Sequence, residues 1–376
     1  MSASAIYLDA NATTPLSREV MAEMTPALAD FFANPSSVHR PGQDARALVD
    51  TARERCAHAL GCAPRDVIFT SGGTEADALA ILGTRPRKVV TTAVEHPAVL
   101  GACAGVPECV RVPVFASGEL DLDALRHALP GASLCSVMAA NNETGVIFPV
   151  REIASLCREH GVPLHVDAVQ AAGKMPLDFP WDLISLSAHK IGGPKGAGVL
   201  ATRTKVVAIQ SGGHQERGRR AGTENVAGIV GMGAALARST AQQPSVALRL
   251  SALRDRLEAT AREIPGARVA GAAAPRVCNT SNVAFEGCDG ETLLAALDFA
   301  GIATSTGSAC SSGSLEPSPV LLAMGYPPAL ARGAIRFSLW SGNTEEEIDR
   351  VCAVLPGIVA RARKTVHNRH SPRRSR

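Results

Sequence analysis

Short apolar runs rich in β-branched residues alternate with helix-like segments through the first two thirds of the chain. Runs of this length, bounded by turn residues, are typical of buried strands. They occupy residues 66–72, 88–94, 133–140, 163–169, 182–188 and 196–202. Between them lie segments such as 151–161, in which apolar residues share one helical face and Gly161 follows as a cap. The alternation predicts an α/β fold, with a mostly parallel sheet covered by helices on both faces.

The pattern changes after about residue 240, which indicates a second domain. A helical run covers 247–264, another helical patch lies near 291–298, and a Gly/Ser-rich loop follows at 305–314. The 376 residues, 46% of them hydrophobic, are enough for two ordinary cores. We expect a large domain of residues 14–250 and a smaller α/β domain of residues 1–13 and 251–360.

The formal net charge of +3 is unevenly distributed. Residues 361–376 contain seven Lys or Arg and no acid, which leaves 31 bases and 35 acids in the remainder. A short basic end with Pro and Ser and no interleaved aromatic residue is typical of a solvated terminus. We therefore predict a disordered tail at 361–376 and no binding of nucleic acid.

Ten cysteines are scattered along the chain without a C-x-x-C pair, so neither a structural zinc site nor a dithiol redox site is expected. The first residues lack a basic segment and reach Asp9 before any apolar run forms, and no stretch of about 18 apolar residues occurs. We expect a cytoplasmic protein with reduced thiols, no metal and no membrane segment.

Polar residues at the ends of the predicted strands are the first candidates for chemistry, because ligands of such sheets bind there. Residues 70–78 read TSGGTEADA, in which Thr74 is expected as a helix N-cap with Asp77 three residues later. Together with Gly73, the exposed N–H groups of that turn could hold a phosphate; the alternative is a turn without a ligand. Neither a Walker motif nor G-x-G-x-x-G is present.

Asp167 and Lys190 end two further predicted strands. A carboxylate at that depth needs a cationic partner such as a pyridinium nitrogen, although a helix-capping Asp would look the same. A lysine among apolar neighbours can act as a nucleophile and form a Schiff base, although most lysines are only solvated. A phosphate cradle, an Asp and a Lys together are the groups that pyridoxal phosphate requires.

Three more residues have both a functional and a structural interpretation. His96 follows a strand, where it could stack on a cofactor ring and move protons, or simply precede Pro97 in a turn. Cys310 lies in STGSACSSGSLEPS, whose small polar residues suit an exposed nucleophilic thiol. Arg336, in the apolar run AIRFSLW, suits a buried partner for a carboxylate, of the substrate or of the protein itself.

Taken in order, these segments resemble the NifS/IscS-type cysteine desulfurases, which are pyridoxal-phosphate enzymes of the class V aminotransferase family. The matching segments include YLDANATT, FTSGGTEAD, AVEHPAVL, HVDAVQAAGK, SLSAHKIGGPKG, GTENVAGIVG, STGSACSSGSLEPS and AIRFSL. They cover nearly everything except the tail. The resemblance implies the fold type I architecture of pyridoxal-phosphate-dependent transferases, with a large domain and a small one.

The resemblance also implies a role for each matching position at the cofactor. Lys190 corresponds to the lysine bound to the cofactor, Asp167 to the partner of the pyridine nitrogen and Gln170 to the partner of the phenolic oxygen. His96 corresponds to the stacking acid/base. The implied phosphate site consists of Gly73, Thr74, Ser187, His189 and, from the neighbouring subunit of a homodimer, Thr223.

At the substrate, the resemblance implies that L-cysteine is bound by Arg336 and Asn142 with help from Asn34. Cys310 corresponds to the thiol that takes the sulfur as a persulfide and passes it to an acceptor or iron-sulfur scaffold protein, while L-alanine is released. A selenocysteine lyase or another class V enzyme is the alternative that keeps Lys190 and Asp167 without needing Cys310. A scaffold for iron-sulfur assembly without catalysis is a more distant one.

The chain departs from the family pattern at three places. Ala10 stands where a second Asn is usual, and Gly193 where Tyr or His is common. Residues 340–343 read WSGN where the family tends to have Gly-Arg. The last change affects the contacts expected behind Arg336.

Overall fold

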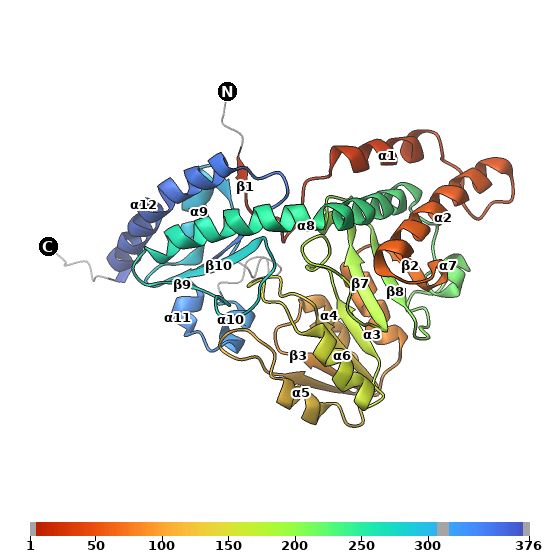
Figure 1. The fold of residues 1–376 in the computed structure, drawn as a ribbon, viewed down its shortest axis with the longest axis horizontal. Helices are drawn as coiled ribbons and strands as arrows, with labels where there is room; N and C mark the ends of the chain where they lie inside the picture. The colour runs from red at the N-terminus through yellow and green to blue at the C-terminus, as the bar shows by residue number, and fades with distance from the viewer. Residues whose placement is uncertain (1–4, 307–315, 371–376) are drawn as a thin grey trace.

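A seven-stranded sheet forms the centre of the larger of two structural units in this computed structural model (Figure 1). The structure describes residues 5–306 and 316–370, and of residues 365–370 only the backbone. The strand order is β2-β8-β7-β6-β5-β3-β4. Strand β8 runs in the direction opposite to the other six. The strands are β2 (Val67–Thr70), β3 (Lys88–Thr92), β4 (Glu108–Val112), β5 (Leu134–Met138), β6 (Leu164–Asp167), β7 (Leu183–Ser187) and β8 (Gly198–Thr202).

Each of the six predicted runs contains one of these strands, and the mostly parallel sheet confirms the predicted fold class. The strand β4 was not predicted. It lies at the edge of the sheet, where its sequence ECVRV mixes exposed and half-buried positions and gives no continuous apolar run.

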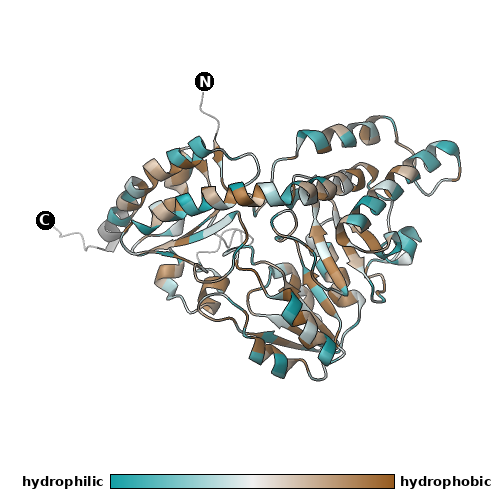
Figure 2. Ribbon diagram, viewed as in Figure 1, coloured by the Kyte–Doolittle hydropathy of each residue, from teal (hydrophilic) through white to brown (hydrophobic). Residues whose placement is uncertain are grey.

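Helices cover both faces of this sheet. The helices of this unit are α1 (Arg18–Ala29), α2 (Arg40–Leu60), α3 (Gly73–Gly83), α4 (Pro97–Ala104), α5 (Leu122–Ala128), α6 (Val150–Glu159), α7 (Gln215–Gly218) and the start of α8 (Val226–Arg262). Along β2, Ile68 packs into the cluster that contains α3 and α4, whereas its neighbours Val67 and Phe69 face the cluster that contains α2, α6 and α8. Figure 2 shows these strands as predominantly hydrophobic and the outer helices as mixed, as expected for a sheet buried on both faces.

The second unit is smaller and has its own core. It contains β9 (Ala267–Val269), β10 (Thr280–Phe285) and β12 (Ala334–Ser338) in an antiparallel sheet, and β1 (Ile6–Tyr7) paired with β11 (Ile302–Ala303). Its helices are α9 (Gly290–Phe299), α10 (Pro319–Ala323), α11 (Pro328–Ala331) and α12 (Glu345–His370). One hydrophobic cluster joins Ile6 and Leu8 to residues between 250 and 362. The N-terminal residues thus pack with the C-terminal third.

The helix α8 connects the two units (Figure 1). It begins 21 residues before the predicted helical run at 247–264, and its 37 residues pass through the expected domain boundary at residue 250. Residues 226–236 are all buried, so this part of the helix has no polar face from which a helical period could be recognised.

The helix α12 differs from the expectation of a disordered tail at 361–376. It continues to His370, and residues 371–376 lie outside the described part. Ala362 packs into the core of the small unit, and Arg363 Nε donates to the Glu286 carbonyl at 2.8 Å. These contacts explain why the helix extends past residue 360.

Candidate active site

A cavity of about 260 Å³ lies at the carboxyl ends of the parallel strands. Met138, Asp167 and Ser187 are the last residues of β5, β6 and β7, and all three line it. Of the thirteen predicted site residues, nine line this cavity: Gly73, Thr74, His96, Asn142, Asp167, Gln170, Ser187, His189 and Lys190. The topology brings them together because adjacent parallel strands end at the same edge.

The N-terminus of α3 forms one wall of the cavity. The N-cap is Gly72 and not Thr74, so the expected cap was misplaced by two residues, and no side chain caps the helix. A Cβ on Gly73 would come within 2.9 Å of Val169 Cγ2, so glycine permits close packing here. The buried Ser187 Oγ has no hydrogen-bond partner within the described residues. Uncapped N–H groups beside an unpartnered hydroxyl fit a phosphate.

Lys190 follows β7 in a short 3-10 turn, Ala188–Lys190. Its Nζ donates to the backbone carbonyls of Asn11 at 2.5 Å and Ala12 at 2.8 Å, so the N-terminal segment closes over the lysine. The neighbouring His189 Nδ1 lies 3.1 Å from Thr13 Oγ1, and burial with the nearby Lys190 charge lowers its pKa to about 4. The resulting neutral ring can hydrogen-bond an anion without adding charge.

Asp167 is buried, and loss of hydration raises its pKa to about 6. Val169 N–H donates to Asp167 Oδ1 at 2.9 Å, which fixes the orientation of the carboxyl group. A buried carboxylate held in this way favours a protonated nitrogen placed against it. The fit to a pyridinium therefore rests on burial and orientation at this residue.

Two further buried carboxyl groups lie near Asp167: Glu95, which was not predicted, and Asp77, which was expected at the helix cap but is buried within α3. Burial and the Asp167 charge raise the pKa of Asp77, which lies on α3 with one oxygen unpartnered among the described atoms. Burial raises the pKa of Glu95 to about 8. His165 Nε2 is 3.6 Å from Asp77 Oδ1, but burial lowers the pKa of the imidazole to about 3, so this pair lacks a cation. The carboxyl groups of Asp77 and Glu95, whether ionised or protonated, therefore place no positive charge beside Asp167.

His96 is the N-cap residue of α4. Its Nδ1 accepts a hydrogen bond from Ala98 N–H at 3.1 Å, so a neutral ring carries its proton on Nε2. Burial and the Lys190 charge lower the pKa of His96 to about 4. The ring is therefore neutral near pH 7 and lines the cavity as a polar, uncharged surface.

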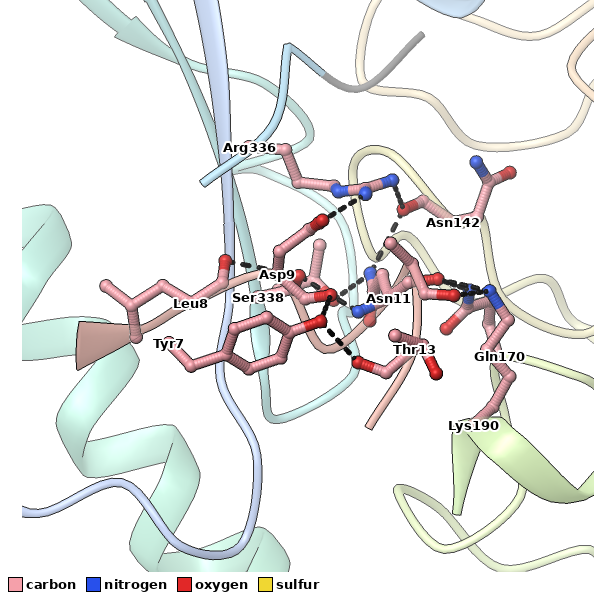
Figure 3. A network of polar contacts seen from close by, with 12 residues as sticks. Tyr7, Leu8, Asp9, Asn11, Thr13, Asn142, Gln170, Lys190, Arg336 and Ser338 are labelled. Carbon is pink, nitrogen blue, oxygen red and sulfur yellow. Dashed lines mark hydrogen bonds and ion pairs between the residues drawn. The ribbon is translucent and has the colours of Figure 1, made fainter. Parts of the chain in front are cut away.

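Asn11 connects the cavity to the small unit (Figure 3). Its carbonyl accepts from Gln170 Nε2 at 3.0 Å as well as from Lys190, and its Nδ2 donates to the Asn142 carbonyl at 3.0 Å. A second lysine, the buried Lys174, donates to Gln170 Oε1 at 2.5 Å. We did not predict Asn11 or Lys174, although both lie in segments that carry the resemblance.

Arg336 lies behind this network and does not line the cavity. Its Nη2 donates to Asp9 Oδ1 at 2.8 Å and its Nη1 to the Asn142 carbonyl at 3.1 Å, while its buried Nε has no partner among the described residues (Figure 3). The guanidinium therefore lies beside the cavity. Its ion-pair partner in the structure is the Asp9 carboxylate, whereas the predicted partner was the carboxylate of the substrate.

Three predicted residues lie elsewhere. Asn34 and Thr223 are exposed and do not line the cavity of their own chain. Cys310 lies outside the described residues.

The residues that the structure describes contain no group of three or more His, Cys, Asp or Glu side chains that could hold a metal ion. None of their helices is long and apolar enough to cross a membrane.

Comparisons with known proteins agree on one family. The model of the class-V aminotransferase family matches residues 6–351. A cysteine desulfurase of Trichormus azollae is 46% identical over 96% of this chain and 94% of its own length. The cysteine desulfurase IscS of Methanosarcina thermophila is 43% identical over 96% and 93%. A solved structure of a NifS-like protein has a TM-score of 0.88 and 34% identity over 95% of this chain and 99% of its own.

The chain therefore belongs to the class-V aminotransferase family, whose members depend on pyridoxal phosphate. Within that family its similarity is to cysteine desulfurases over almost the whole length. The resemblance found in the sequence is confirmed.

Proposed function

We propose that this protein is a cysteine desulfurase that uses pyridoxal phosphate to convert L-cysteine to L-alanine. The observation that carries the proposal is that Lys190, Asp167 and the uncapped N-terminus of α3 meet in one cavity. Almost full-length similarity to cysteine desulfurases supports the choice of substrate.

Bound pyridoxal phosphate supplies an electron sink for the electrons left when a bond at the substrate Cα breaks. When the cofactor is bound, the Gly73 and Thr74 N–H groups, with Ser187 Oγ, would hold its phosphate. Asp167 would favour a proton on the ring nitrogen, and Lys190 would bind the cofactor and take the proton from the substrate Cα. His96, uncharged near pH 7, would lie against the ring and could receive or give a proton.

The remaining steps are assigned from the resemblance. Cys310 attacks the substrate sulfur, the bond between that sulfur and Cβ breaks, and the sulfur stays on Cys310 as a persulfide. Arg336 exchanges Asp9 for the substrate carboxylate, with Asn142 and Asn34 nearby. An acceptor protein, such as an iron-sulfur scaffold, then removes the sulfur.

The substitution Cys310→Ser tests this function. We expect the purified variant to keep the visible absorption of the bound cofactor and to lose sulfide and persulfide formation from L-cysteine. Unchanged sulfide release would favour the alternative, a selenocysteine lyase or another class V lyase that needs no thiol. A wild-type protein without cofactor absorption would contradict the whole proposal and favour a scaffold without catalysis. Cys352→Ser, on α12 away from the cavity, is the matched control.

A homodimer with shared active sites accounts for the two exposed site residues. Thr223 and Asn34 do not line the cavity of their own chain, and we infer that they serve that of a second copy. Large exposed apolar side chains flank Asn34, namely Leu28, Phe32 and Val38, which are 69%, 86% and 89% exposed. Such a group favours burial against a partner.

The proposed location is the cytoplasm. All nine cysteines among the described residues are free, and reduced thiols are typical of that compartment.

A further inference from the structure

Lys174 is a buried lysine for which the proposed reaction has no use. It is 9% exposed and lies four residues after Gln170, in the turn that follows β6. No carboxylate among the described residues is within salt-bridge distance of its Nζ. Burial and the nearby Lys190 charge lower its pKa to about 7. A buried amine without a counter-ion is costly, so its contacts should show what it contributes.

The first contact fixes one end of an amide. Lys174 Nζ donates to Gln170 Oε1 at 2.5 Å, whereas Gln170 Nε2 donates to the Asn11 carbonyl at 3.0 Å. An amide rotated by 180° would set its NH₂ group against the lysine and its oxygen against a carbonyl, losing both bonds. A charged lysine can only donate, so Lys174 holds Gln170 in one orientation while its amine is protonated.

The second contact extends to Lys190. Lys174 Nζ also donates to Asn11 Oδ1 at 3.0 Å, which Asn279 Nδ2 approaches at 3.1 Å from the small unit. The carbonyl of the same Asn11 accepts from Lys190 Nζ at 2.5 Å. Two hydrogen-bonded paths thus connect Lys174 to Lys190. One runs through the Gln170 side chain and the other through the Asn11 side chain.

We propose that Lys174 is a positioning residue that fixes the Gln170 amide and the Asn11 carbonyl around Lys190. Its action makes Gln170 a donor, and not an acceptor, toward an anionic oxygen of the cofactor. This inference rests on the proposed function, because it supposes pyridoxal phosphate bound to Lys190.

The test is a pH titration of the cofactor's visible absorption band in purified holoenzyme. In Lys174→Met, Gln170 can rotate, and an anionic oxygen without its donor holds the neighbouring proton more tightly. We expect the apparent pKa of the band to rise by about one unit. Lys205→Met, an exposed lysine after β8, should leave the titration unchanged. Lys174→Leu replaces Lys174→Met if the latter gives no soluble holoenzyme.

A double-mutant cycle with Gln170→Leu separates positioning from charge alone. If Lys174 acts through Gln170, Lys174→Met should shift the titration by less than half as much in the Gln170→Leu background. An equal shift in both backgrounds, or no shift in the single variant, would overturn the inference while the absorption band itself still supports the proposed function. Absence of the band from wild-type protein would instead remove the proposed function.

Discussion

At the scale of single residues, the site is defined by how burial changes acid and base strength. The same loss of hydration keeps His96 and His189 neutral and makes Asp167 a weak acid that suits a cationic partner. Lys190, Asp167 and His96 could be predicted because each ends or follows a strand and belongs to a recognisable segment. Glu95 and Asp77 could not, because nothing in the sequence shows that an acid will be surrounded by apolar side chains.

Glu95 allows a prediction about stability and pH. Its Oε1 accepts hydrogen bonds from Thr92 Oγ1 at 2.8 Å and Met138 N–H at 2.9 Å, and its Oε2 has no partner among the described atoms. The folded-state pKa of about 8 lies above the value in the unfolded chain. The unfolded chain therefore releases the proton first, and the folded state loses stability as the pH rises toward 8, by ~1.4 kcal/mol per pH unit.

The variant Glu95→Gln should lack this dependence, because glutamine keeps the acceptor and never ionises. Urea unfolding at pH 6 and pH 8 should show wild-type protein losing about 2 kcal/mol more than the variant between the two pH values. Glu54→Gln, an exposed position on α2, is the control and should behave as wild type. Parallel pH dependence in wild type and Glu95→Gln would show that Glu95 ionises normally.

At the scale of elements, the site depends on where strands end and how closely the next helix approaches. The six predicted strands share an uninterrupted apolar character, which the sequence displays directly. The start of α3 was misplaced because Thr74 looks like a cap, whereas the chain uses Gly72, which has no side chain to bind the N–H groups of the first turn. Gly193 shows the same close packing, since a Cβ there would lie 2.9 Å from Ala188 and Ala235.

Gly73→Ala tests the close approach at α3. The added Cβ would meet Val169 Cγ2 at 2.9 Å, so the first turn must move away from the phosphate site. We expect the dissociation constant of pyridoxal phosphate to rise about tenfold, or ~1.4 kcal/mol, with the fold retained. Equilibrium dialysis against the cofactor measures this change.

The matched control is Gly101→Ala on α4, where an added Cβ has no neighbour within 4 Å. This variant should bind the cofactor as wild type does and gain slightly in helix stability. Equal affinities for Gly73→Ala and wild type would mean that the phosphate site at the start of α3 tolerates a side chain at residue 73.

At the scale of the whole molecule, two units are held together by the N-terminal segment and by α8. Asn11 binds residues of both units. Asn343 Nδ2 donates to the Tyr7 carbonyl at 3.1 Å, so the WSGN departure holds the start of the N-terminal segment within the small unit. Thr223 is exposed and does not line the cavity of its own chain, which is the placement that the proposed shared sites require.

Mixing two inactive variants tests whether sites are shared between subunits. Lys190→Ala removes the lysine, and Thr223→Asp places a negative charge against the phosphate of the other subunit's site. After the two are unfolded and refolded together, half of the dimers are mixed and one of their two sites is intact. Desulfurase activity should recover to about a quarter of wild type. Recovery near zero would place Thr223 and Lys190 in the same chain's site.

The sequence by itself determined the α/β class, the six central strands, the family and the residues at the strand ends, because apolar runs and polar strand ends are local patterns. The tertiary structure alone decided which buried groups act on one another: Lys174 with Gln170 and Asn11, Arg336 with Asp9, and the acids around Asp167. Apart from Lys174 and Gln170, which are four residues apart, these contacts join residues that are far apart in the chain, and the pKa values of the acids depend on burial. Neither property is visible in the sequence, because both arise only when distant elements pack together.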